Sequence, residues 1–369
     1  MKKFNPLVFL ASLGAGGISV IPFALLNYSF PHEKGLIYIG QVDHGSLSIM
    51  QELLIRFLEG TMIVFVSIHF VLTIIFFVQL WKWLKEKEFT DMLHDPLSNS
   101  SMLAPFISVV MTLNVFIGPI RYFISSMAEN LQVFMMPAFI VWALIWVALM
   151  AFEIKLLTIS FEKSFDVNKI HFGWLLHPFA LAMLSVTGAG IAALAQNAEI
   201  AHVSAFLTVV SASMGFFLLV VKLIALFKSH FALPGLPERQ FLPSFLIVIP
   251  NITLYAITAF RLGHYIEHHH SMEMGPYFLI VILSAFAFET WYMAFGLSLL
   301  KNYFKNHFSK EFYLSQWGLV CPFVAYAVLG SFLYSVFVLS ILLYAVILAS
   351  MLTSIVFFFI LSVKHLKVK

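Results

Sequence analysis

Residues 312–326 read FYLSQWGLVCPFVAY, an apolar stretch in which Pro322 lies inside a predicted helix. A proline in a helix interior removes one backbone hydrogen bond and clashes with the preceding turn, so we expect a kink here. In a lipid bilayer such a break is tolerated only where the freed backbone faces other protein or a water-filled path. The stretch therefore predicts a transmembrane helix that faces a permeation path.

The composition of the whole chain is that of a membrane protein. Of its 369 residues, 61% are hydrophobic and only 11% are charged, which leaves too few polar side chains to cover a soluble protein. The formal net charge of +3 is small and scattered, so we expect no nucleic-acid partner. Cys321 is the only cysteine, which excludes an intrachain disulfide and a metal site built from thiolates alone.

Ten apolar segments are long enough to cross about 30 Å of hydrocarbon. We therefore expect an all-α integral membrane protein in which residues 1–369 form one domain and the partner surface is the lipid bilayer. No small-residue cleavage site follows the first segment, so we interpret it as a span and not as a signal peptide. The predicted spans are 7–27, 50–81, 103–127, 131–158, 172–195, 202–227, 241–266, 275–299, 312–331 and 335–363.

Lysines and arginines are divided unequally between the two sides of these spans. The poorer side has Lys34, Arg121 and Arg261, with Arg56 near its membrane boundary. Because positive residues collect on the cytoplasmic side, we predict a multi-pass protein of the plasma membrane with both termini in the cytoplasm. The richer side has Lys2, Lys3, Lys82, Lys85, Lys87, Lys155, Lys163, Lys169, Lys222, Lys228, Arg239, Lys301, Lys305, Lys310, Lys364, Lys367 and Lys369.

Helix-breaking residues are concentrated in the odd-numbered spans. The even-numbered spans are cleaner, with Pro137 as the main interior exception. This alternation predicts five helical hairpins around a central pore, each pairing a kinked inner helix with a straight outer one. The alternative, that the prolines are merely scattered, stays open at this point. The prolines that we expect to approach the pore axis are Pro22, Pro119, Pro178, Pro250 and Pro322.

Several motifs resemble the tellurite-resistance/dicarboxylate transporter family, which includes slow anion channels, malate permeases and sulfite exporters. The sequence SQWGLVCP at 315–322 is similar to the tryptophan-x-x-x-phenylalanine-proline signature of the family's ninth span. LPSFLIVIP at 242–250 resembles its proline-bounded seventh span. His94-Asp95-Pro96 and Asn5-Pro6 resemble its approaches to the third and first spans. The resemblance covers nearly the whole chain.

This resemblance implies a homotrimer of ten-helix protomers, each with its own pore lined by the odd helices. The implied substrates are small inorganic or carboxylate anions: dicarboxylate, sulfite, nitrate, chloride or tellurite-related species. In the family a phenylalanine before the ninth-span proline plugs the pore, and here that position is Cys321. Phe323 is the nearby aromatic, but two residues along a helix turn it by about 200°, so it cannot simply substitute.

An anion path needs positive potential at its mouths and weak polar contacts inside. Arg121 and Arg261 near the outer ends of the third and seventh spans could attract anions, or could anchor the helices at the interface. His177 lies within a span directly before Pro178 and is a candidate functional group. Further candidates, which could instead bond helix to helix, are Asn114, Thr187, Asn251 and Thr253.

A histidine-rich tract follows the seventh span and supports one competing hypothesis. Such a tract in an outer loop, residues 264–274, could bind a transition metal, which would make the chain a membrane metalloenzyme or metal-handling protein. The spacing His264-x-x-x-His268-His269 resembles one histidine box of the membrane di-iron desaturases, but the further boxes that those enzymes need are not found here. There is also no Walker, triad or Rossmann signature, so we favour transport, with neither enzymatic activity nor a cofactor. The possible metal ligands are His264, His268, His269 and His270.

Overall fold

The computed structural model describes residues 4–32, 35–166, 169–232, 235–337 and 339–368. Within these ranges, all regular secondary structure is helical. Ten helical segments among the described residues are long and apolar enough to cross a membrane, which confirms the predicted number of spans. Lys2, Lys3, Lys34 and Lys369, which entered the topology prediction, lie outside the described residues.

The five odd-numbered spans form a closed inner ring and the five even-numbered spans surround it. Of the most apolar 18 residues of each span, 50–100% are buried in the odd spans but only 22–33% in the even ones. The outer helices are α2 (Ile49–Trp83), α7 (Leu131–Glu162), α9 (Ala198–Ala232), α11 (Gly275–Leu299) and α14 (Ile341–Val368). The principal inner helices are α1 (Phe9–Ser29), α4 (Ala104–Val115), α8 (Leu176–Leu194), α10 (Val248–His270) and α13 (Val320–Val336).

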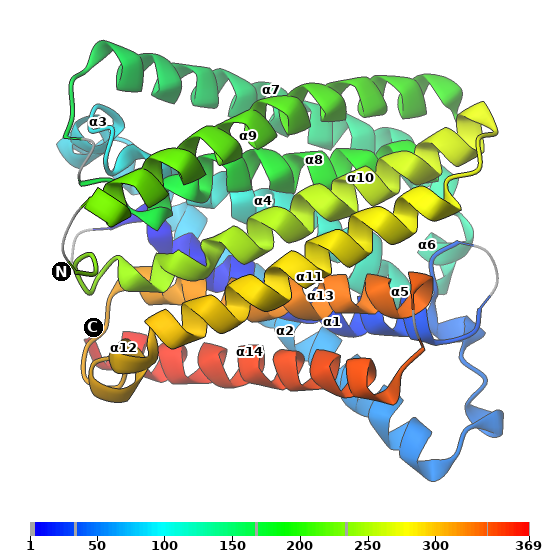
Figure 1. Ribbon diagram of the computed structural model, residues 1–369. Helices are drawn as coiled ribbons and strands as arrows, with labels where there is room; N and C mark the ends of the chain where they lie inside the picture. The colour runs from blue at the N-terminus through cyan, green and yellow to red at the C-terminus, as the bar shows by residue number, and fades with distance from the viewer. Residues whose placement is uncertain (1–3, 33–34, 167–168, 233–234, 338, 369) are drawn as a thin grey trace.

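The inner ring follows chain order, because α1 packs on α4, α4 on α8, α8 on α10, α10 on α13, and α13 on α1. Each outer helix contacts the inner helix that precedes it in the chain. Helix α7 is the partial exception, since it packs more against α8 than against α4. Helix α1 begins and α14 ends at the same end of the bundle, as an even number of spans requires (Figure 1).

Each inner helix is entered through a short 3₁₀ helix. The third span continues beyond α4 as a π-helical turn, η5 (Phe116–Ile120), and then α5 (Arg121–Phe123). It stops there, before the end that we predicted, because Ile124 turns extended before α6 (Ser125–Glu129). The five entry turns are η1 (Pro6–Val8), η4 (Asn99–Leu103), η7 (Phe172–Leu175), η8 (Leu242–Ile247) and η9 (Leu314–Leu319).

Because of these entry turns, the kinks that we expected at three of the prolines are not required. Pro178, Pro250 and Pro322 are each the third residue of their α-helix. In the first turn the backbone N–H has no partner within the helix, so a proline there costs little and need not kink it. Of the five prolines expected at the pore axis, only Pro22 inside α1 and Pro119 inside the π-helical turn occupy helix interiors.

The remaining short elements connect the spans at the two ends of the bundle. They are η2 (Ile39–Gln41), η3 (His44–Ser46), α3 (Lys87–Leu93) and α12 (Lys301–Asn306).

Close packing within the ring depends on glycine where α1 crosses α13. A Cβ atom on Gly17 would lie 2.9 Å from Val324 Cγ1, and one on Gly14 would lie 3.2 Å from Val320 Cγ1, so both positions favour glycine.

Candidate permeation pathway

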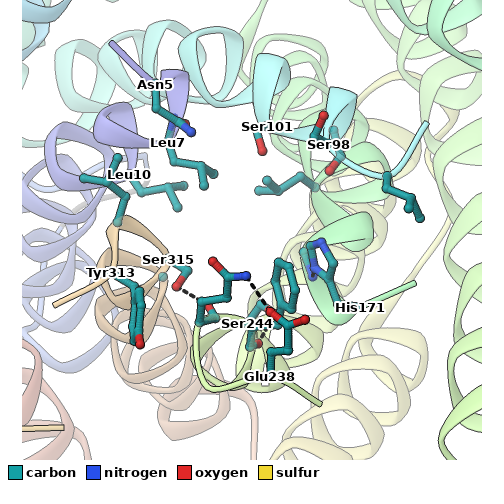
Figure 2. A pocket seen from close by; sticks show the side chains of 18 of the residues that line it. Asn5, Leu7, Leu10, Ser98, Ser101, His171, Glu238, Ser244, Tyr313 and Ser315 are labelled. Carbon is teal, nitrogen blue, oxygen red and sulfur yellow. Dashed lines mark hydrogen bonds between the residues drawn. The ribbon is translucent and has the colours of Figure 1, made fainter. Parts of the chain in front are cut away.

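A large cavity of about 1800 Å³ opens at the end of the bundle where the inner helices begin. We call it the amino-end vestibule. All five 3₁₀ entry turns contribute to its wall, and Figure 2 shows side chains from these turns and their approaches around the opening. The outer helices α2 and α14 also contribute near their ends, through Gln79, Trp83 and His365 among others. Its labelled lining includes Asn5, Leu7, Leu10, Ser98, Ser101, His171, Glu238, Ser244, Tyr313 and Ser315.

Two of the five entry turns have a side-chain cap. The Asn5 Oδ1 atom accepts a hydrogen bond from Leu7 N at 2.9 Å, and His171 Nδ1 accepts one from Gly173 N at 3.1 Å. Burial lowers the pKa of His171 to about 4, so at neutral pH the ring is uncharged and Nδ1 can act as an acceptor. The turns η4, η8 and η9 lack a side-chain cap, which leaves water or a solute to satisfy free backbone groups there.

Charged side chains of both signs also line the amino-end vestibule. Two of the acidic groups are engaged locally: Asp95 accepts hydrogen bonds from Leu97 N and Ser98 Oγ, and Glu238 accepts one from Gln240 Nε2 at 2.8 Å. The side chains alone therefore give this vestibule no excess of positive charge. Its charged lining is Lys82, Lys169, Glu86, Asp95 and Glu238.

A second cavity of about 490 Å³ lies nearer the carboxyl ends of the inner helices. We call it the carboxyl-end vestibule. Its wall is built from all five inner spans, together with Gly35 and Leu36 of the loop after α1. Most of the lining is apolar. The polar and charged members are Asn27, Tyr28, Asn114, Thr187, Thr253, Arg261, His264, Glu267 and His268.

One helical turn separates the two vestibules along four of the inner spans. Leu10 lines the amino-end vestibule and Leu13 the other, and the corresponding pairs are Leu176 with Phe179, Ile247 with Pro250, and Gly318 with Cys321. Nearly all of these side chains are apolar, so the path between the vestibules crosses an apolar belt. A narrow apolar segment resists both ions and water. We define the constriction by Leu10, Leu13, Leu176, Phe179, Ile247, Pro250, Gly318 and Cys321.

Several predicted site residues come together on the wall of the carboxyl-end vestibule. Asn114 of α4 donates from Nδ2 to Thr187 Oγ1 of α8 at 2.7 Å, a bond between two inner helices. Arg261 donates from Nη1 to the Val186 carbonyl at 2.7 Å. Among the described residues no carboxylate lies within 4.0 Å of Arg261. The predicted residues on this wall are Pro250, Cys321, Asn114, Thr187, Thr253, Arg261, His264 and His268.

The other predicted residues lie elsewhere in the bundle. Arg121 is 1% exposed and donates to the carbonyls of Ile117 and Ile37, so it joins the third span to the loop after α1. The Phe323 ring stacks on Phe357 of α14, with centroids 5.4 Å apart. Asn251 donates to the Ile247 carbonyl of its own span. Arg121, Phe323 and Asn251 do not line either vestibule. The same holds for the other predicted residues Pro22, Pro119, Pro178, Pro322, His177 and His270.

His177 faces away from the path, toward the outer helices. Its Nδ1 lies 2.7 Å from Glu153 Oε2 of α7, and both side chains are buried. Lys222 of α9 lies within electrostatic reach of both and donates to the Trp174 carbonyl at 3.4 Å. Lys222, which the topology prediction assigns to the lysine-rich side, is only 4% exposed and lies inside the bundle.

The histidine tract is helical, contrary to the loop that we predicted. His264 to His270 form the last two turns of α10. His268 and His269 bond to the carbonyls of Ala193 and Ala195, and His202 bonds to Tyr265. The described part of the chain contains no group of three or more histidine, cysteine or acidic side chains placed to hold a metal ion.

Two fully buried carboxyl groups escaped the sequence analysis. Glu153 and Glu289 are each 0% exposed within predicted spans. Glu289 Oε1 accepts a hydrogen bond from Thr253 Oγ1 at 2.5 Å. The signal was present in the sequence, because an acidic residue inside a transmembrane segment is rare and usually functional or paired.

The comparisons with known proteins agree with this architecture. The family model described as voltage-dependent anion channel matches residues 3–366. No curated protein matches the chain. Members of this family transport anions across membranes, and the match spans every inner helix, both vestibules and the constriction. With ten membrane-spanning helices arranged as two concentric rings, this chain belongs to the voltage-dependent anion channel family.

Proposed function

We propose that this chain conducts small inorganic or carboxylate anions across the plasma membrane through a path within each protomer. The path runs from the amino-end vestibule, across the constriction, to the carboxyl-end vestibule. The lysine distribution supports a cytoplasmic position for the amino-end vestibule and for both termini. The family resemblance favours a homotrimer, and the exposed apolar faces of the outer helices suit contact with lipid or with neighbouring protomers.

The observation that carries the proposal is the meeting of five helix amino ends at one cavity. The amino end of a helix has a partial positive charge because its first N–H groups lack partners and its peptide dipoles are aligned. Such ends bind anions in many proteins. Five of them around about 1800 Å³ favour anions over cations, even though the side chains there carry both signs.

At the opposite end of the path the helix dipoles have the reverse effect. The carboxyl-end vestibule lies nearer the helix carboxyl ends, where the partial charge is negative. Arg261 supplies a positive charge at this wall, and it has no carboxylate partner within 4.0 Å among the described residues. A guanidinium half-buried beside a small cavity attracts anions more strongly than one in bulk water.

Flux measurements test the proposal directly. Purified protein in liposomes should pass chloride, nitrate and malate, and the reversal potential in a salt gradient should follow the anion and not potassium. Liposomes without protein are the control. A potassium-selective reversal potential, or the absence of flux for every anion, would contradict the proposal, and native mass spectrometry of the same sample tests the homotrimer separately.

A further inference from the structure

The Thr253–Glu289 pair stands out among the buried polar groups that the proposed path does not use. Thr253 of α10 lines the carboxyl-end vestibule one turn beyond Pro250 of the constriction. Its hydroxyl donates to Glu289 Oε1 of the outer helix α11 at 2.5 Å. Glu289 is therefore one hydroxyl group away from the path.

The surroundings of Glu289 contain no compensating positive charge. The side chain is 0% exposed, and no lysine, arginine or histidine nitrogen lies within 4.0 Å of it among the described residues. The second carboxyl oxygen, Oε2, has no hydrogen-bond partner there. On α13 the titratable group within its reach is the Tyr326 hydroxyl, which is bonded to Thr290. The other polar group facing it is Thr253 on α10.

This isolation contrasts with the other fully buried carboxyl group of the bundle. Glu153 is bonded to His177 and lies within reach of Lys222. A carboxylate without such partners is expensive in a membrane interior, and intramembrane acidic residues mark proton and ion pathways. The unpartnered oxygen and the contact with the hydroxyl of a residue that lines the path distinguish Glu289 from a purely structural acid.

We propose that Thr253 and Glu289 form a proton-linked anion site in the carboxyl-end vestibule, an inference that rests on the proposed anion transport. With Glu289 ionised, the Thr253 hydroxyl donates to the carboxylate, and its proton is not available to a solute. With Glu289 protonated, the carboxyl O–H donates to Thr253 Oγ1 across the same 2.5 Å contact. The hydroxyl proton is then free to turn toward an anion in the vestibule.

The proton balance of this switch is simple. A hydronium ion in the vestibule gives one proton to Thr253 Oγ1, which passes its own proton to Glu289 Oε1, so that one O–H bond forms on the carboxyl group and one breaks in the hydronium ion. Protonation removes a negative charge next to the path and supplies a donor to it. Both effects favour the anion, so anion and proton bind together, and by linkage each raises the affinity for the other.

Nitrate flux in liposomes, measured between pH 5 and pH 8 with potassium and valinomycin to hold the voltage, tests this coupling. Nitrate is a suitable probe because it does not titrate in this range. In the wild type we expect flux at low nitrate to rise about 5-fold or more on acidification. Glu289→Gln should give high flux at every pH, because the amide donates to Thr253 as the protonated acid does. Thr253→Val should give low flux with little pH dependence.

Thr187→Val is the matched control. Thr187 lines the same vestibule, but its hydroxyl bonds to Asn114 and to the Met183 carbonyl and not to an acid. This variant should keep the wild-type pH dependence, whatever its flux. A Glu289→Gln protein with an unchanged pH dependence, or a wild type without one, would overturn the inference while leaving anion transport intact. The absence of nitrate flux at every pH would instead count against the proposed function.

A second measurement does not depend on flux. Adding nitrate to purified wild-type protein in weakly buffered detergent should cause proton uptake, which a pH indicator dye reports. Infrared difference spectra should show the corresponding protonated carboxyl band. Thr253→Val should weaken the uptake and Glu289→Gln should abolish it. Equal uptake by wild type and Glu289→Gln would assign the proton to another group and would overturn the inference.

Discussion

Glu153 on α7 and His177 on α8 are joined by a 2.7 Å hydrogen bond, and their side chains are only 0% and 1% exposed. Lys222 on α9 lies close enough for its charge to act on both. One buried polar cluster therefore lies between three neighbouring helices, the inner helix α8 and the outer helices α7 and α9. The Glu153 Oε1 and His177 Nε2 atoms have no partner in the described structure, which leaves the cluster intolerant of further losses.

Replacing Glu153 with glutamine should destabilise the protein by about 3–5 kcal/mol, because it leaves Lys222 buried without a counter-charge. Thermal unfolding in detergent measures the loss. His44 and Glu52 offer a matched control, since their distance is also 2.7 Å but each side chain is 31% exposed. Glu52→Gln should change stability little, because exposed pairs contribute little. Equal losses in the two variants would show that burial does not decide the effect.

Arg261→Gln should lower anion flux by about tenfold or more at low ionic strength, and the difference should shrink in high salt, because a fixed charge beside the path acts by attracting the anion. Flux measured across a series of salt concentrations checks this expectation. Arg121→Gln is the control. Arg121 lines neither vestibule and donates to the carbonyls of Ile37 and Ile117, so its loss should lower thermal stability without a salt-dependent effect on the flux per folded protein.

Gly190 provides an independent test of the same position. A Cβ atom there would lie 3.1 Å from Arg261 Nη1, so Gly190→Ala should displace the guanidinium group and lower flux in the same direction as Arg261→Gln, but less. Combining the two substitutions should add little beyond Arg261→Gln alone, since both act through one group. Fully additive effects would mean that Gly190 acts by another route.

The pH dependence of stability should report His171. Burial lowers its pKa to about 4, from an ordinary value of 6.5. Between these values the unfolded chain binds a proton that the folded protein does not, so stability falls as the pH falls from about 6.5 to 4. His171→Asn should reduce this loss, because asparagine also caps a helix but does not titrate. Unfolding midpoints at pH 7 and pH 5 measure the difference, and an unchanged difference would contradict the assignment.

The number and approximate positions of the spans, and their division into inner and outer helices, could be predicted from the length of the apolar segments and from the alternation of proline and glycine. Two boundaries were wrong, since the third span ends at Phe123 and α10 continues to His270. The sequence was misleading about the prolines themselves. The sequence does not distinguish a proline at the third position of an α-helix from one that kinks the helix centre. The two cases differ only in where the preceding 3₁₀ turn ends and the α-helix begins. Pro322 lies in the first turn of α13 and not in its interior.

The site was less predictable because it depends on packing between spans. Arg121 and Arg261 both lie near the predicted outer end of an inner span. Arg121 is buried and bonded to two backbone carbonyls, whereas Arg261 lines the carboxyl-end vestibule. The histidine tract is polar, which led to the prediction of a loop. In the structure α10 continues through the tract, and His268 and His269 bond to backbone carbonyls at the end of α8. The amino-end vestibule was not foreseen, since its wall is assembled from the starts of five separate helices.

The topology should place Lys87, Lys163 and Lys305 in the cytoplasm and His269 outside, because lysines collect on the cytoplasmic side. Single cysteines at these four positions, in a Cys321→Ser background, can be tested with an impermeant thiol reagent on intact cells. We expect labelling only at position 269. Labelling of the variant at position 163 from outside would invert the proposed orientation of both vestibules.

Cys321 lines the carboxyl-end vestibule at the constriction, where the family resemblance implies a phenylalanine. A thiol fills less space than a phenyl ring, so Cys321→Phe should narrow the apolar belt and reduce anion flux severalfold, while Cys321→Ala should leave flux unchanged or slightly raised. Flux in liposomes is the measurement. A permeant thiol reagent should inhibit the wild type and spare Cys321→Ala, because the added group would occupy the same narrow segment.

Overpacking is the competing explanation for any effect of Cys321→Phe, since the side chain is only 8% exposed and extra volume in a well-packed site is destabilising. The two explanations differ in what happens to the folded protein. Steric narrowing predicts a normal yield and a normal unfolding midpoint with low flux, whereas overpacking predicts a low yield and an early midpoint. A well-folded Cys321→Phe protein with wild-type flux would remove Cys321 from the constriction, and the narrowest point would then have to be sought at Phe179 or Leu13, which line the same turn of the path.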